Sequence, residues 1–519
     1  MYRHVTPDRF AVIKEFYEEL VTPLNTTFAY VEVPGEDDLY SPFEATIDNF
    51  ARLCECLNLV DVKTLYKSKY KVLLPNNLFC CNKMLNIIHT YANIRVYTSY
   101  GIQEARSYHG KCRKCKRVYY HGLAIDKNTG IYTFDDFEDT ILFSTGVAFS
   151  KEVIQRADDM ICIGNISFER TASILDANYG FTTNVNPDRL ESAWFLFRIL
   201  EFVREFNWPR KNSSGEFDLE ELCKMAYARI KNSVDNEWLH HKCSEVGCNE
   251  RFVVMDGNAK LYRSLCGANK SRVIGKNGEV NGYNICIRNP TRGNQHGSSN
   301  TFCSAHHNDK DSDTDPVLDL RPVTRSMTNN VPVTITNGEG CKSNENIERF
   351  YRRTAGMFYL FRPCGIRLSN FEMYTAESLS DVFKYIVDVF GEYPTFEQIR
   401  GLVYDRCCEL KPFLQRLAGE GNDIASRYLN LLYIVDIFHA ERHTEAKCVL
   451  NSGSCEFHPH LPEFEHVRKM NTEIAEQSFK ELNMIKCTTR KMTYAKRILF
   501  LKFIDHSFNK KTVERRKRR

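Results

Sequence analysis

The chain has 519 residues, of which 43% are hydrophobic and 26% are charged, and its net charge is +4. These values are typical of a globular protein with several domains, and they exclude a fibrous, a disordered or a uniformly basic DNA-coating protein. No apolar run approaches the roughly 18 residues of a membrane helix, and the N-terminus lacks the apolar segment of a secretory signal. We therefore expect no membrane association and a compartment in which the 20 cysteines stay reduced. We expect zinc ligands among these cysteines.

In chain order, the patterns predict an α/β (α+β) fold class. An N-terminal region ends in a cysteine-dense segment, and a mixed region follows with short β-rich runs and two helical stretches of apolar spacing near 3.6. A Cys/His cluster then surrounds the strand-like ERFVVMDGN, and a polar segment has the composition of a disordered insert. The remainder is well patterned up to a basic tail. The expected regions are 1–130, 131–235, 236–307, 308–348, 349–509 and 510–519.

The first metal-type cluster lies in the N-terminal region. Cys80 and Cys81 precede the knuckle Cys112-x-x-Cys115, which basic and aromatic residues follow. Four thiolates around a tetrahedral zinc ion would tie two loops together, with one or both of the adjacent cysteines as ligands. A thioredoxin-like redox motif is the alternative, but no βαβ pattern follows the knuckle, so we favour structural zinc.

Basic residues interleave with this knuckle and are candidates for contacts with DNA phosphates. They are Lys111, Arg113, Lys114, Lys116 and Arg117. The alternative is a solvated basic loop. The last ten residues carry seven basic groups against Glu514, a net +6, so the other 509 residues sum to −2. This tail is typical of a nuclear localisation or nucleic-acid-binding segment, or else of a solvated terminus.

Two further groups of soft ligands occur later in the chain. The second cluster contains His240, His241, Cys243 and Cys248 before the strand-like ERFVVMDGN, and Cys266, Cys286, Cys303, His306 and His307 after it. The third contains His439, His443, Cys448, Cys455 and His458. Both predict structural zinc, because protein ligands can fill all four tetrahedral positions. The pairing of ligands stays open, and the alternative is a set of buried free cysteines.

Three carboxylates occur in patterns that suit metal-dependent chemistry. Asp256 ends an apolar run of β character, and Asp405 follows the run Leu402–Tyr404 in the same way. Glu473 and Glu476 lie three positions apart near the start of a helix, on roughly one face. Two strand-end aspartates and a helical glutamate can hold two Mg²⁺ or Mn²⁺ ions for phosphodiester chemistry. The alternative is that each aspartate is a turn or cap residue.

The same segments resemble the signatures of KDZ (Kyakuja–Dileera–Zisupton) transposases. ERFVVMDGNAKLYRSLC resembles the family's Asp-Gly-Asn…Lys-Leu…Arg block, and LVYDRCCEL resembles its Tyr-Asp-x-x-Cys-x-Leu block. Asp436-x-x-His439 is similar to the Cys/Asp-x-x-His motif of several eukaryotic transposases, and MNTEIAEQSF resembles the block that carries the last acid. The upstream cysteine pattern resembles the cysteine clusters associated with KDZ proteins.

This resemblance implies an RNase H-like catalytic domain with insertions, preceded by the Cys-rich zinc-binding region. Asp256, Asp405 and Glu476, with Glu473 as the alternative, would hold the catalytic Mg²⁺ or Mn²⁺ ions, and Asp436 and His439 would buttress the site. Water would cleave DNA at the transposon end, and the freed 3′-hydroxyl would attack target DNA. The resemblance further implies transposon ends and target DNA as partners and a homo-oligomer on DNA. The basic tail suits action in the nucleus.

Two other functions remain open from the sequence. One is a catalytically decayed or host-recruited transposase that acts as a zinc-dependent DNA-binding protein. The other is a zinc-bearing interaction protein whose aspartates are structural. The presence of all three acids favours a DDE transposase that retains its chemistry.

Overall fold

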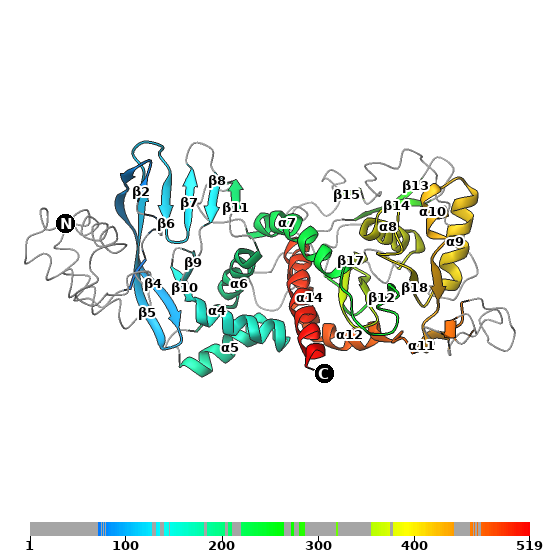
Figure 1. Ribbon diagram of the computed structural model, residues 1–519. Helices are drawn as coiled ribbons and strands as arrows, with labels where there is room; N and C mark the ends of the chain where they lie inside the picture. Colours follow the sequence, from blue (N-terminus) through cyan, green and yellow to red (C-terminus); the bar gives the residue numbers. More distant parts are fainter. Residues whose placement is uncertain are drawn as a thin grey trace, which may run out of the picture. The chain divides into compact units, whose positions relative to one another are not determined.

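The computed structural model separates the chain into two compact units, Met1–Ala226 and Tyr227–Arg519 (Figure 1). It describes residues 71–73, 75, 77, 79–126, 131–134, 140–144, 146–180, 184–202, 206–209, 219–263, 271–274, 280–285, 318–319, 354–373, 377–440, 457–459, 461, 464–465 and 469–518. The expected mixed α/β class is confirmed. The polar segment 308–348 lies outside the described residues except for 318–319. Within the described ranges, no helix has the length and apolar character needed to cross a bilayer.

The N-terminal unit is built on a nine-stranded sheet with the strand order β11-β8-β7-β6-β5-β4-β10-β9, while β1 pairs with β5. Its strands are β1 (Lys71–Leu73), β4 (Asn86–Thr98), β5 (Gly101–Lys111), β6 (Val118–Tyr120), β7 (Leu123–Asp126), β8 (Ile131–Phe134), β9 (Thr140–Ser144), β10 (Val147–Ser150) and β11 (Phe206–Pro209). A separate small hairpin joins β2 (Phe79–Cys80) to β3 (Lys83–Met84). Strand β11 lies at the edge of the sheet, where Pro209 is tolerated because an edge leaves some N–H positions unpaired.

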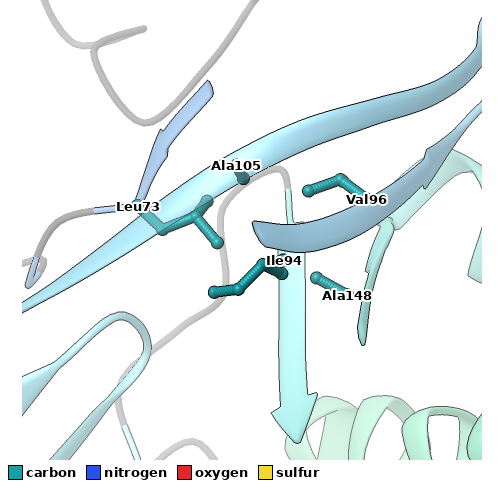
Figure 2. Packing of buried hydrophobic residues seen from close by; sticks show 5 residues of the cluster. All are labelled: Leu73, Ile94, Val96, Ala105 and Ala148. Carbon is teal, nitrogen blue, oxygen red and sulfur yellow. The ribbon is translucent and has the colours of Figure 1, made fainter. Parts of the chain in front are cut away.

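One buried cluster in this sheet consists of small and aliphatic side chains. Leu73, Ile94, Val96, Ala105 and Ala148 are fully buried and form one cluster from β1, β4, β5 and β10 (Figure 2). The two alanines leave room for the larger side chains of neighbouring strands, which keeps the packing dense. The helices of the unit are α4 (Lys151–Asp158), η1 (Asp159–Ile163), α5 (Phe168–Tyr179) and α6 (Pro187–Phe202). Of these, α4 and α6 pack on the sheet at β10.

The C-terminal unit contains a five-stranded mixed sheet of order β17-β16-β12-β18-β19. The strands are β12 (Phe252–Asn258), β16 (Gly356–Phe361), β17 (Arg367–Met373), β18 (Gly401–Val403) and β19 (Leu432–Ile434). Strand β16 is antiparallel to β12 and β17, whereas β12, β18 and β19 run parallel. The carboxyl ends of these three parallel strands therefore share one edge of the sheet. A second, three-stranded sheet contains β13 (Ser271–Ile274), β14 (Val280–Ile285) and β15 (Leu318–Asp319).

Helices cover both faces of the five-stranded sheet, which explains why β16 is buried at every position. On one face, Phe479 of α12 (Ile474–Leu482) contacts Tyr359 and Phe361 of β16. On the other, Tyr385 of α8 (Leu379–Phe390) packs against Phe371 of β17, with the two rings tilted by 44°. The other helices are α7 (Leu219–Leu239), which crosses the boundary of the two units, and α9 (Cys407–Gly419), α10 (Asp423–Tyr428), α11 (Ile437–Ala440), η7 (Asn483–Ile485), α13 (Lys486–Arg490) and α14 (Tyr494–Lys517).

The long helix α14 is fixed to the sheet by buried charged groups. Arg497 pairs with Glu372 of β17, and Asp505 accepts a hydrogen bond from Arg367 at 3.1 Å. Because each buried charge has a partner, the cost of its desolvation is offset. The basic segment expected as a separate tail from residue 510 onwards is in fact the last part of this helix, which continues to Lys517.

Candidate metal centres

An acidic cluster lies at the edge of the C-terminal sheet where its parallel strands end. Asp256 lies in β12, and Asp405 follows the end of β18 by two residues. Glu377, just before α8, is the third member. One carboxylate oxygen of each residue lies within 4.8 Å of the other two. Oxygens bound to one Mg²⁺ ion are up to about 4.2 Å apart, so small side-chain rotations would suffice for metal binding.

The electrostatics of this cluster are unfavourable without a cation. Desolvation, then the charges of Asp405 and Glu377, raise the pKa of Asp256 well above its ordinary value. Desolvation and the charge of Glu377 raise the pKa of Asp405 to about 7. The Oδ1 atom of Asp405 is buried and has no hydrogen-bond partner among the described residues. A hard divalent cation would remove the repulsion and satisfy this atom, so these residues fit Mg²⁺ or Mn²⁺.

Neither helical glutamate belongs to this trio. Glu476 lies in the first turn of α12 and is exposed, while Glu473 occupies the position before the helix. The charge of Glu476 nevertheless contributes to the raised pKa values of Asp256 and His439, which places it beside the cluster. Such a helical carboxylate can approach a bound metal by changing its rotamer.

A third parallel strand brings an Asp–His pair to the same edge. Asp436 follows β19 by two residues and accepts a 2.6 Å hydrogen bond from Nδ1 of His439 on α11. This bond raises the pKa of His439, and the positive charge of the ring acts on Asp405 and Glu377 in turn. The Nδ1 atom of His439 is therefore hydrogen-bonded to a carboxylate. Within the described ranges, His439 belongs to no group of side chains that could hold a metal ion. Its predicted role as a support for the acids fits this geometry better than its role as a zinc ligand.

The small residues after Asp256 explain the Asp-Gly-Asn sequence. A Cβ atom at Gly257 would lie 2.1 Å from Oε2 of Glu377, so only glycine lets that carboxylate approach the strand. Asn258 is buried, and its amide nitrogen donates to Asn483 of η7 at 3.3 Å. This contact connects β12 to the segment that follows α12, and thereby holds Glu476 near Asp256.

The remaining signature residues hold the site together. Arg263 is fully buried and forms a two-pronged hydrogen bond to Glu372, at 3.1 and 3.0 Å. Tyr404 donates its hydroxyl hydrogen to Glu377, and Arg406 donates to the Glu377 carbonyl at 2.8 Å. The residues around Asp405 thus orient Glu377, which the sequence analysis had missed because 66 acidic residues offer no signal that distinguishes it.

The N-terminal unit contains a cluster of four sulfurs. Cys80 and Cys81 come from the β2–β3 hairpin, and Cys112 and Cys115 from the turn between β5 and β6. One sulfur of each lies within 4.8 Å of the others, with Cys80 and Cys115 separated by 3.4 Å. Four sulfurs bound to zinc at about 2.3 Å are roughly 3.8 Å apart, which these distances approach. Both adjacent cysteines, Cys80 and Cys81, are members of the group, so the geometry allows both to be ligands.

The backbone around this cluster positions the sulfurs and favours their thiolate form. Cys81 and Asn82 both have positive φ, at 52° and 60°, as a two-residue hairpin turn requires. Lys116 also has a positive φ of 62°, and its N–H donates to the Cys112 carbonyl at 3.0 Å. The backbone N–H of Cys115 is the main cause that lowers the pKa of Cys112 to about 6. The group therefore fits a structural zinc ion, with all four positions filled by protein.

The basic residues beside the knuckle divide into two kinds. Arg113, Lys114 and Lys116 are exposed, and Lys111 at the end of β5 is partly exposed. Arg117 instead lies 3.6 Å from Asp126 and hydrogen-bonds Tyr119. Three side chains are thus available for phosphate contacts, whereas Arg117 serves the local fold.

A second sulfur cluster, in the C-terminal unit, combines predicted and unpredicted residues. His241, Cys243, Cys248 and Cys364 each place one ligand atom within 4.8 Å of the others. Cys364 was missed, although its position in RPCGIR between two apolar runs is typical of a hairpin turn. His240 is not in the group, and His458 is buried but also lies outside it. The other predicted zinc ligands lie outside the described residues; they are Cys266, Cys286, Cys303, His306, His307, His443, Cys448 and Cys455.

One comparison with known proteins bears on this arrangement. Residues 69–179 match the family model of the CxC5-like cysteine cluster associated with KDZ transposases. The matched segment contains all four sulfurs of the N-terminal cluster and most of the nine-stranded sheet. No curated protein matches the chain. The cysteine cluster at residues 69–179 supports the assignment of this chain to the KDZ transposase family.

Proposed function

We propose that this chain is a DDE-type transposase that cleaves DNA at transposon ends and joins the freed 3′-hydroxyl to target DNA. The observation that carries the proposal is the cluster of Asp256, Asp405 and Glu377, with Glu476 beside it, in a chain whose N-terminal unit carries a KDZ-associated cysteine cluster. A purely structural role would leave the repulsion between these desolvated carboxylates uncompensated.

The sheet supports an RNase H-like fold for the C-terminal unit. The family resemblance predicts a mixed sheet with one acid on the first strand, another on a neighbouring strand, and a glutamate on a later helix. Asp256 in β12, Asp405 after the adjacent parallel strand β18, and Glu476 on α12 agree with that expectation.

The chain's own residues would perform distinct tasks. Asp256, Asp405 and Glu377 would hold the divalent ions, which would activate the attacking oxygen and stabilise the leaving one. Glu476 would complete the coordination from the first turn of α12. Its charge, which acts on the pKa of Asp256, favours it over Glu473, which lies before the helix. The His439–Asp436 pair would place a positive charge beside Asp405 and keep its carboxylate ready for metal.

The N-terminal unit would bind DNA, with zinc in the four-cysteine cluster to hold the knuckle. The exposed side chains of Arg113, Lys114 and Lys116 would contact phosphates. We propose further that the enzyme acts in the nucleus as a homo-oligomer, because two transposon ends must be brought together. The basic end of α14 would contribute to nuclear entry through its exposed residues, which are Lys510, Arg515, Lys517 and Arg518.

The proposal is tested with a donor plasmid that carries the genomic DNA flanking this chain's coding sequence on both sides. With Mg²⁺ or Mn²⁺, the full chain should release the ends and join them to a target plasmid, and EDTA should abolish both steps. Sequencing of the junctions would locate the joined 3′-ends. DNA binding without cleavage under all metal conditions would contradict the proposal and favour a decayed transposase that acts as a zinc-dependent DNA-binding protein.

The raised pKa of Asp405 predicts a pH-dependent effect of metal on stability. Its pKa is about 7 in the folded protein and 3.8 ordinarily, so in metal-free protein its contribution to stability is present below pH 4 and is lost as pH rises to 7. Mg²⁺ relieves the charge repulsion that remains above pH 7. We therefore expect Mg²⁺ to raise the melting temperature more at pH 8 than at pH 5.5, as measured by calorimetry. Asp405→Asn should reduce this difference, and an equal Mg²⁺ effect at both pH values would contradict the assignment.

A further inference from the structure

The second sulfur cluster joins segments that are far apart in the sequence. His241, Cys243 and Cys248 lie between the end of α7 and the start of β12, whereas Cys364 lies in the turn between β16 and β17. The sulfurs of Cys248 and Cys364 are 3.6 Å apart although the residues are separated by 116 positions. This separation is close to the roughly 3.8 Å expected for two thiolates on one zinc ion, and far longer than the roughly 2.05 Å of a disulfide.

The surroundings of the four side chains suit a bound cation and anionic sulfurs. The Nε2 atom of His241 is buried and has no hydrogen-bond partner in the described part of the chain. Three thiolates and one imidazole on Zn²⁺ carry a net charge of −1, and the nearby guanidinium groups of Arg251, Arg362 and Arg516 would balance it. A buried group of this charge needs such compensation.

Glycines at positive φ and close packing shape both loops around the cluster. Gly247 has a φ of +78°, and a Cβ atom there would lie 2.2 Å from the sulfur of Met470. Gly365 has a φ of +93°, and the Gly365 N–H donates to the Arg362 carbonyl at 2.8 Å to close the β16–β17 turn. Backbone donors at Glu245 and Ile366 point to the sulfurs of Cys243 and Cys364. Each loop therefore has a defined shape that presents its sulfurs inward.

We propose that His241, Cys243, Cys248 and Cys364 bind one structural zinc ion that clips the amino-terminal end of β12 to the β16–β17 turn. The ion lies near Phe252, at the end of β12 that is farther from Asp256. Phe252 and Asp256 are about 13 Å apart along the strand, at roughly 3.3 Å per residue. It therefore takes no part in phosphodiester chemistry. It fixes the register of the strand that carries Asp256. Because the ion closes a long loop, it lowers the conformational entropy of the unfolded chain more than a short-loop site would.

The zinc clip also fixes the basic end of α14. Arg516 donates to the Cys364 carbonyl at 2.9 Å and to Glu245 at 2.6 Å, so it contacts both loops that hold the ligands. Zinc loss would free these loops and with them the last turn of α14. The basic segment would then become more accessible to trypsin, which cleaves after lysine and arginine.

Zinc content measured by plasma mass spectrometry tests the proposal on the full chain. Cys364→Ser should contain one zinc ion per chain fewer than the wild type, and limited trypsin digestion should remove residues after Lys510 faster. Cys487→Ser is the matched control, because Cys487 is exposed and lies outside both clusters, and it should keep the wild-type zinc content. An unchanged zinc content in Cys364→Ser, or iron in place of zinc, would overturn the proposal.

A measurement on the wild-type chain covers the case in which Cys364→Ser does not fold. Cys243 is only partly buried, so iodoacetamide can reach it once its metal is removed. Mass spectrometry should show Cys243 protected in the native protein and alkylated after a zinc chelator is added. Equal alkylation before and after chelation would overturn the proposal, as would a Cys248–Cys364 disulfide found in the native protein.

Discussion

Asp256→Asn is expected to abolish metal-dependent DNA cleavage and joining while leaving the fold intact. A metal ion contributes several kcal/mol of transition-state stabilisation, and each roughly 1.4 kcal/mol changes the rate tenfold, so we expect a loss of about 10³-fold or more. The amide has almost the shape of the carboxylate, and it replaces a group whose charged form is disfavoured by desolvation and by the charges of Asp405 and Glu377. The melting temperature of metal-free Asp256→Asn should therefore equal or exceed that of the wild type.

Asp423→Asn is the control for this substitution. Asp423 is exposed in the first turn of α10 and outside the acidic cluster, so its amide variant should cleave DNA at the wild-type rate. The same assay separates the two glutamates. Glu377→Gln should raise the Mg²⁺ concentration needed for cleavage, because Glu377 lies inside the trio, whereas Glu476→Gln should lower the rate at saturating Mg²⁺. Wild-type cleavage by Asp256→Asn would refute the catalytic assignment of the cluster.

Loss of zinc from the four-cysteine cluster is expected to have the second large effect. Cys112→Ser should lose one zinc ion per chain and unfold the β2–β3 hairpin and the β5–β6 turn, because structural zinc contributes about 10–16 kcal/mol of binding free energy in small zinc domains. DNA binding should fall with it, since the knuckle positions Arg113, Lys114 and Lys116. Zinc content, calorimetry and DNA affinity at two salt concentrations measure the three consequences.

The same cluster is distinguished from a redox pair by its response to oxidant and chelator. A zinc site should lose its metal to a chelator under reducing conditions and regain it when zinc is returned. Cys487→Ser should behave like the wild type in this cycle. A reversible disulfide between Cys112 and Cys115 with no change in zinc content would instead support the thioredoxin-like alternative.

Much of the metal chemistry is visible in local patterns. The Cys112-x-x-Cys115 knuckle is short enough that its turn brings both sulfurs to one ion whatever the rest of the chain does. The apolar runs before Asp256 and Asp405 likewise predict strands whose ends carry carboxylates, because β-branched and aromatic residues favour buried strands. Such local signals come from backbone geometry over a few residues.

The partners of these residues depend on contacts between distant segments. Glu377 reaches the acidic cluster only because β12 and β18 are neighbours and Gly257 leaves space for its carboxylate. Cys364 reaches Cys248 only because β16 pairs antiparallel to β12, which returns the β16–β17 turn to the start of β12. No periodicity within either segment contains that information, so neither residue was predicted.

The basic C-terminus shows the same division. Its charge is evident from composition, and the sequence alone determined that it is a candidate for nuclear entry or nucleic-acid contact. The tertiary structure decided that these residues continue α14 and that Arg516 is used by the loops around Cys364. Residue types and short spacings thus determined which chemistry this chain can support, whereas strand pairing decided which side chains meet. A metal site requires ligands within a few ångströms of one another, and only the folded sheet brings distant segments that close.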